Sequence, residues 1–356
     1  MRIIYHLLVV IFILLCAACS SESEDADNYT SLSRYTDPGK MAFMLEEMPR
    51  NVLEICKIAE QQMVHHNLLV YHNVPYRQNQ GIPPRMSRLL TMLKERNPHN
   101  LYEEREVVDR IVSSCIVECH FLAGLLRHKG IPARTRAGYF RDILANPEHF
   151  SDFWEKTFRG RRVMGNLLAS DPVAWKKWVD SFTGKQIQDN HYIEHWICEY
   201  WDEEMNKWRI LDANTTFLKA SCGLDVGYLL PRKHYEYAFE AWKKMRSDKN
   251  FNPDQYREDD QNGQFHIRKS MLWDYFSLLN HDIAGFENPG GDARKRIYKP
   301  FNELSSVEIE ELDQLAELLS KNPSKKELID FYQKSTTLKL KDVEKDPYSF
   351  IFKKKV

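Results

Sequence analysis

The residues from 114 to 140 constrain the fold more than any other part of this chain. Apolar side chains recur at steps of three and four between Ser114 and Lys129, which predicts a helix with one buried face. Gly130 is typical of a helix end, and Pro132 prevents the helix from continuing. Aromatic and β-branched residues then favour a strand over Ala133 to Phe140. We therefore expect a helix that stops abruptly and leads into a strand.

A predicted β-hairpin follows further along the chain. His195 to Trp201 and Trp208 to Asp212 have strand composition, and the polar segment Asp202 to Lys207 is typical of the turn between them. In such a hairpin His195 and Asp212 lie on adjacent strands near the same end, within one or two residues of register. The two features together predict an α+β fold, in which the helix packs on an antiparallel sheet.

Additional helices are expected on both sides of this unit. The stretch from about Pro38 to Leu101 is mostly helical in pattern, and three later segments have helical spacing. These three are Tyr235 to Met245, Arg268 to Asn280 and Ser305 to Ser320, the last opened by a capping sequence.

Cys115 stands at the start of the predicted helix, directly after two serines. The positive end of a helix dipole favours a thiolate over a thiol. A free cysteine has a pKa near 8.5, and pairing with a histidine can lower it to about 3 to 4. This shift corresponds to roughly 6 kcal/mol, more than a helix dipole supplies, so the hypothesis requires a cationic partner.

His195 is the candidate partner among the 13 histidines, because its hairpin neighbour Asp212 can fix the orientation of the imidazole. We therefore predict a catalytic triad of Cys115 as nucleophile, His195 as base and Asp212 as orienting acid.

The order of these motifs resembles a known enzyme family. Cys115 is followed by GIPAR at 130–134 and GY at 138–139, and then by HWICEYW at 195–201 and WRILD at 208–212. This pattern is similar to that of the transglutaminase-like superfamily of papain-like cysteine enzymes, and to its bacterial lipoprotein-type members in particular. The resemblance implies a papain-like fold and a triad that cleaves a peptide or carboxamide bond through a thioacyl intermediate. We expect no cofactor, and we favour hydrolysis over cross-linking.

Two alternatives stay open. Ile116-Val117 replaces the Arg-Asp that follows the cysteine in many family members, and Asp109 stands where papain has its oxyanion glutamine, so the chain could be an inactive binding module with this fold. Alternatively, His191, Glu194 and His195 spell the H-x-x-E-H motif of a zinc hydrolase. That motif requires a helix, whereas the sequence here favours a strand.

The N-terminus resembles an export signal. Residues 1–18 carry one early positive charge and an apolar run, and Cys19 stands where a bacterial lipoprotein is acylated. Residues 19–37 are expected to form a disordered acidic tether. We therefore expect an exported protein, periplasmic or on the cell surface, that is anchored to a membrane through a lipid on Cys19.

The rest of the composition limits the partners and sets the domain boundaries. Fifty basic residues nearly balance 51 acidic ones, so no overall field attracts nucleic acid, and we expect a peptide or amide substrate instead. Residues 38–290 are expected to form the transglutaminase-like domain, with 291–356 as a helical extension packed on it. The cysteines lack the paired spacing of a zinc site, so no metal is expected.

Overall fold

The computed structural model describes residues 25–69, 71–72, 74, 83, 85–96, 100–141, 153, 192–256, 263–280 and 299–338. The expected signal segment 1–18, Cys19 and His191 lie outside the described residues. In the described part of the chain, no helix combines the length and apolar character that crossing a membrane requires.

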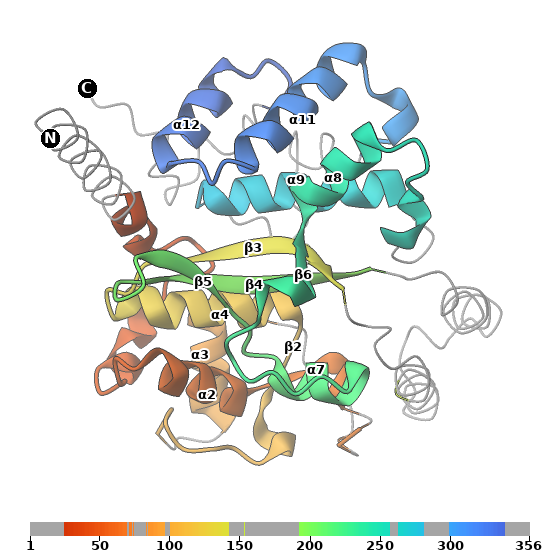
Figure 1. Ribbon diagram of the computed structural model, residues 1–356. Helices are drawn as coiled ribbons and strands as arrows, with labels where there is room; N and C mark the ends of the chain where they lie inside the picture. The colour runs from red at the N-terminus through yellow and green to blue at the C-terminus, as the bar shows by residue number, and fades with distance from the viewer. Residues whose placement is uncertain are drawn as a thin grey trace, which may run out of the picture.

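The fold is a mixed α+β structure built on a curled, four-stranded antiparallel sheet (Figure 1). The strands are β3 (Ala133–Phe140), β4 (Ile193–Asp202), β5 (Lys207–Leu211) and β6 (Tyr235–Tyr237), in the order β5-β4-β3-β6. β4 and β5 form the predicted hairpin, with Cys198 opposite Leu211. The helix expected from Tyr235 begins only at Ala238. The three residues before it form β6, because they pair with the edge of β3.

Helix α4 (Cys115–His128) packs on one face of this sheet (Figure 1). Gly130 adopts a φ of 76°, a left-handed conformation that suits glycine, and β3 begins three residues later, so the predicted stop is confirmed. Below α4 in Figure 1 lie α2 (Val52–Gln62), α3 (Met86–Arg96) and α7 (Thr215–Cys222). A small parallel sheet of β1 (Met63–His65) and β2 (Ile111–Ser113) leads into α4.

A second helical layer lies on the other side of the sheet (Figure 1). It consists of α8 (Ala238–Ser247), α9 (Gly263–Leu278), α11 (Ser306–Leu319) and α12 (Lys325–Lys334). Ser305 and Ser324 start α11 and α12 with complete capping boxes. Short 3-10 helices cover Asn28–Thr30, Gly39–Leu45, His66–Leu68, Val107–Asp109, Arg232–His234, Pro253–Tyr256 and Phe301–Glu303.

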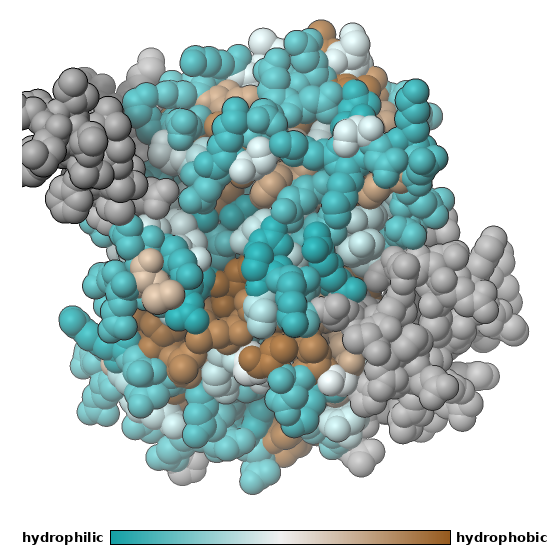
Figure 2. Space-filling view, viewed as in Figure 1, coloured by the Kyte–Doolittle hydropathy of each residue, from teal (hydrophilic) through white to brown (hydrophobic). Residues whose placement is uncertain are grey.

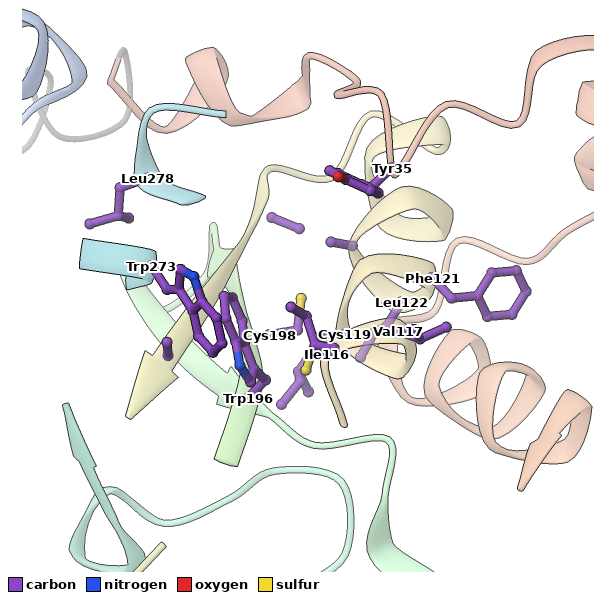
Figure 3. Close-up of a cluster of buried hydrophobic side chains, with 14 of the residues drawn as sticks. Tyr35, Ile116, Val117, Cys119, Phe121, Leu122, Trp196, Cys198, Trp273 and Leu278 are labelled. Carbon is purple, nitrogen blue, oxygen red and sulfur yellow. The ribbon is translucent and has the colours of Figure 1, made fainter. Parts of the chain in front are cut away.

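The hydrophobic core joins these layers through β4 and α4. Figure 3 shows Ile116 and Cys119 of α4 facing Cys198 of β4, while Trp196 lies beside Trp273 of α9. Figure 2 shows hydrophilic residues over the helices and a band of apolar residues across the middle of this face.

The chain packs on the domain earlier than the expected boundary at residue 38. Tyr29 is fully buried, and its ring meets Trp208 edge to face at 5.4 Å. The carboxylate of Asp25 accepts a hydrogen bond of 2.7 Å from the backbone N–H of Lys325 at the start of α12. Tyrosines and short polar side chains thus order residues 25–37, although their acidic composition favoured a tether.

Candidate active site

His195 and Asp212 form a buried pair at the end of the hairpin. His195 Nε2 and Asp212 Oδ2 are 2.6 Å apart, and both residues are at most 3% exposed. The second oxygen, Asp212 Oδ1, accepts a hydrogen bond of 2.7 Å from the backbone N–H of Asn214. Both carboxylate oxygens therefore have a partner, and the imidazole of His195 contacts one of them. The register of the hairpin predicted that these two residues lie close together.

The geometry of this pair selects one nitrogen for chemistry. Because Nε2 of His195 faces the carboxylate, Nδ1 is the nitrogen that can exchange a proton with another group. The imidazole meets the edge of the Phe140 ring at 6.0 Å, and the hydroxyl of Tyr235 donates to the backbone carbonyl of His195 at 3.0 Å. Asp212 and Phe140 thus contact the imidazole, while Tyr235 holds the backbone of the same residue.

Cys115 is the first residue of α4 and is half-buried. The other four cysteines among the described residues are buried, and burial raises the pKa of each of their thiols. A buried thiol with a raised pKa is poorly reactive. Cys115 is thus the described cysteine whose position best suits a reactive thiol.

Helix α4 packs on strand β4, the strand that carries His195. Glu118 and Cys119 follow Cys115 by one helical turn, and the pKa of each is raised mainly by burial and also by the charge of Asp212. Side chains three and four residues apart lie on the same side of a helix. The charge of Asp212 therefore acts on two side chains in the first turns of α4, the helix that begins with Cys115.

Glu118 is a carboxylic acid in unusual surroundings. Burial raises its pKa from 4.5 to about 8, although a hydrogen bond of 2.5 Å from Ser113 Oγ to Oε1 acts in the opposite direction. The nearby charges of Asp212 and Glu60 raise it further. At neutral pH the carboxyl is therefore mostly protonated, so that it can donate a hydrogen bond.

Three buried polar atoms beside the pair have no hydrogen-bond partner among the described residues: Ser114 Oγ, Glu118 Oε2 and Asn214 Nδ2. Glu118 and Asn214 line the same cavity, whose volume of about 20 Å³ is enough for one water-sized group, and whose lining does not include Cys115, His195 or Asp212. A buried polar group without a partner is costly, so we expect a water or another bound group to complete its hydrogen bonds. An amide N–H and a neutral carboxyl can both donate to an oxygen that enters the cavity.

Sequence reasoning did not find Glu118 and Asn214. Their positions offered a signal, since Glu118 lies one turn after Cys115 and Asn214 two residues after Asp212. Their lack of partners and the protonation of Glu118 depend on burial, which the sequence pattern does not contain.

The described end of the zinc motif, from Ile193 to His195, takes the strand conformation that the sequence favoured, and His191 lies outside the described residues. Glu194 and His195 both lie within β4, where successive side chains point to opposite faces. Glu194 contacts His266 at 3.3 Å and Lys269 at 3.4 Å, both on α9, whereas His195 contacts Asp212. The two residues thus belong to different clusters.

Comparison with known proteins found no family model, no curated protein and no solved structure that matches this chain.

Proposed function

We propose that this protein is a cysteine enzyme of the transglutaminase-like type, with a papain-like fold, which cleaves a peptide or carboxamide bond. The observation that carries the proposal is the buried contact of 2.6 Å between His195 and Asp212, next to a helix that begins with a half-buried cysteine. A nucleophile, a base and an orienting acid are the parts that such a reaction requires.

In the proposed reaction the Cys115 thiolate attacks the carbonyl carbon and forms a C–S bond. The tetrahedral intermediate then breaks its C–N bond, and protonated His195 gives its proton to the leaving amine. Water attacks the resulting thioester, which releases a carboxylic acid and returns the thiol. We favour hydrolysis because water is always present as the acceptor.

Glu118 and Asn214 have a role in this proposal. The negative charge that develops on the carbonyl oxygen requires donors that are already oriented toward it. Glu118 lies one helical turn after Cys115, Asn214 lies two residues after Asp212, and each has a buried side-chain atom without a hydrogen-bond partner among the described residues. They would supply the oxyanion donors that the motifs do not identify.

Alkylation with iodoacetamide tests the nucleophile without knowledge of the substrate. We expect wild-type Cys115 to be labelled at about pH 6, where an ordinary thiol near pKa 8.5 reacts slowly. Cys115→Ser should abolish this labelling. His195→Ala should shift it to above about pH 8, because the thiolate loses its cationic partner. Peptide mass spectrometry would identify the labelled residue.

His234→Ala is a matched control. The ring of His234 also lies against Phe140, at 6.5 Å, but His195 is the histidine that contacts Asp212. The control should therefore be labelled as the wild type is. Labelling of Cys115 only above about pH 8 in the wild type would show a passive thiol and refute the enzyme.

We also propose that the protein is exported and held at a membrane by a lipid on Cys19. The support is the apolar run at residues 1–18 and the small residues before this cysteine. Mass spectrometry of the mature N-terminus tests it, and an unmodified cysteine or serine at that end would contradict it.

A further inference from the structure

A large cavity lies between the sheet and the second helical layer, away from the His195–Asp212 pair. Its volume is about 710 Å³, within the range of about 300 to 1,000 Å³ that is common for ligand sites. Strands β3, β4 and β5 contribute one wall, and α8 and the end of α11 contribute the opposite one.

The wall of this cavity is rich in positive charge. Its acidic residues are Glu199 and Glu240, and its basic residues are Arg134, Arg136, Lys207, Arg232 and Lys243. Asp274 pairs with Arg136 at 2.8 Å, and Glu317 pairs with Lys243 at 2.8 Å, but neither acid belongs to the wall. Arg232 also pairs with Glu240 at 2.6 Å, so the excess of positive charge at this wall comes down mainly to Lys207 and to the spare donors of Arg134.

Two buried guanidinium groups are held rigidly at this wall. Glu199 accepts hydrogen bonds from Arg134 at 2.7 Å and from Arg136 at 3.2 Å. Arg134 also lies over the Trp208 ring at 4.0 Å, and Arg136 over the Tyr237 ring at 4.3 Å. Stacking and ion pairing fix their orientation before any ligand arrives, which reduces the entropy lost on binding.

Part of the donor capacity remains for a ligand. A guanidinium has five N–H donors, and Arg134 uses one toward Glu199 and one toward Asn322. At the rim, Lys207 is exposed and forms no ion pair with a described residue. Arginine forks suit the planar oxygens of carboxylate and the oxygens of phosphate.

We propose that this cavity is a binding site for a small organic molecule that carries a carboxylate or phosphate group. The oxyanion lies against Arg134 and Lys207, and the body of the molecule occupies the space toward Phe239 and Leu319. The site is separate from the proposed thiol chemistry and does not depend on it.

Isothermal titration of the full chain with three related sugars tests the proposal. Glucuronate and glucose 6-phosphate carry the two oxyanions, and glucose is the neutral member with the same ring. We expect one-to-one binding of at least one charged sugar, with an affinity that falls as salt is added, and no binding of glucose. Preference between the two charged sugars identifies the oxyanion. Absence of binding by both, or equal binding of glucose, would overturn the proposal.

Variants locate the bound molecule. Lys207→Glu should weaken binding about tenfold at low salt, because it reverses an exposed charge at the rim without disturbing the buried network. Lys249→Glu makes the same charge change at an exposed lysine outside the wall and should leave the affinity within about twofold. Arg134→Gln should abolish binding, with circular dichroism to verify folding. Equal losses in Lys207→Glu and Lys249→Glu would exclude this cavity as the site.

Discussion

Strand β4 carries two buried polar clusters that differ in how well their atoms are bonded. At one end, His195 and Asp212 lie near Ser114, Glu118 and Asn214, each of which has a buried atom without a partner among the described residues. Further along the strand, Glu199 accepts from Arg134, Arg136 and the hydroxyl of Tyr237. No buried side-chain atom of these four residues lacks a partner within the described chain.

Two glutamates make the difference quantitative. Burial by itself would raise the pKa of Glu199, but the charges of Arg134 and Arg136 outweigh it and lower this pKa to about 2. Burial raises the pKa of Glu118 to about 8, and no arginine compensates it. A buried cluster whose charges are paired stabilises the fold, even where single N–H donors such as those of Arg134 remain for a ligand, whereas a buried atom without a partner requires a hydrogen bond from another group. We therefore predict that changes at Glu199 act mainly on stability and that changes at the Glu118 cluster act mainly on the proposed thiol chemistry.

The largest expected effect is on stability at the satisfied cluster. Glu199→Gln removes the charge that Arg134 and Arg136 share, and breaking such a buried pair costs about 3 to 5 kcal/mol. Urea denaturation would measure the free energy of unfolding. Glu203→Gln, at an exposed position in the hairpin turn, is the matched control and should change it by less than about 0.5 kcal/mol. Similar losses in both variants would contradict the assigned role.

The next effect is on acyl transfer at the unsatisfied cluster. Asn214→Ala removes a proposed oxyanion donor, and loss of one such donor costs about a hundredfold in rate. Acylation of Cys115 by p-nitrophenyl acetate, followed through nitrophenolate release, measures this. Alkylation by iodoacetamide forms no oxyanion and should stay unchanged in the same variant. A parallel fall of both rates would show that Asn214 positions the thiol instead.

A pH effect should distinguish the two glutamates further. With a folded pKa of about 8 against an ordinary 4.5, Glu118 binds its proton more tightly in the folded state. Its contribution to stability is complete below about pH 4.5 and is lost as the pH rises through about 8, at roughly 1.4 kcal/mol per pH unit. Glu118→Gln, which cannot ionise, should therefore gain stability relative to the wild type over this interval. A constant difference between the two proteins from pH 5 to pH 8 would show that Glu118 is ionised throughout.

The smallest effect compares two neighbouring serines. Ser113 Oγ donates to Glu118 at 2.5 Å, whereas Ser114 Oγ has no partner among the described residues. Ser113→Ala should lower the free energy of unfolding by about 1 kcal/mol, and Ser114→Ala should leave it nearly unchanged. Thermal denaturation of the two variants side by side measures the difference. A larger loss from Ser114→Ala would mean that its hydroxyl has a structural role.

The sequence was sufficient where structure follows from neighbouring residues. The stop at Gly130, the strand after Pro132 and the hairpin that joins His195 to Asp212 were predicted because backbone preferences and strand register act over short distances. Expectations failed where distant segments meet. Tyr235 to Tyr237 join the edge of β3, and Tyr29 is buried against Trp208, although neither stretch shows this in its own pattern.

By itself, the sequence determined the helix, the hairpin and the candidate thiol, imidazole and carboxylate, because these depend on residue type and local geometry. Only the tertiary structure decided that one glutamate is ionised and the other protonated, which donors lack partners and where basic residues line a cavity. The physical reason is that solvation and charge depend on everything packed around a group, and segments from most of the chain contribute to that packing.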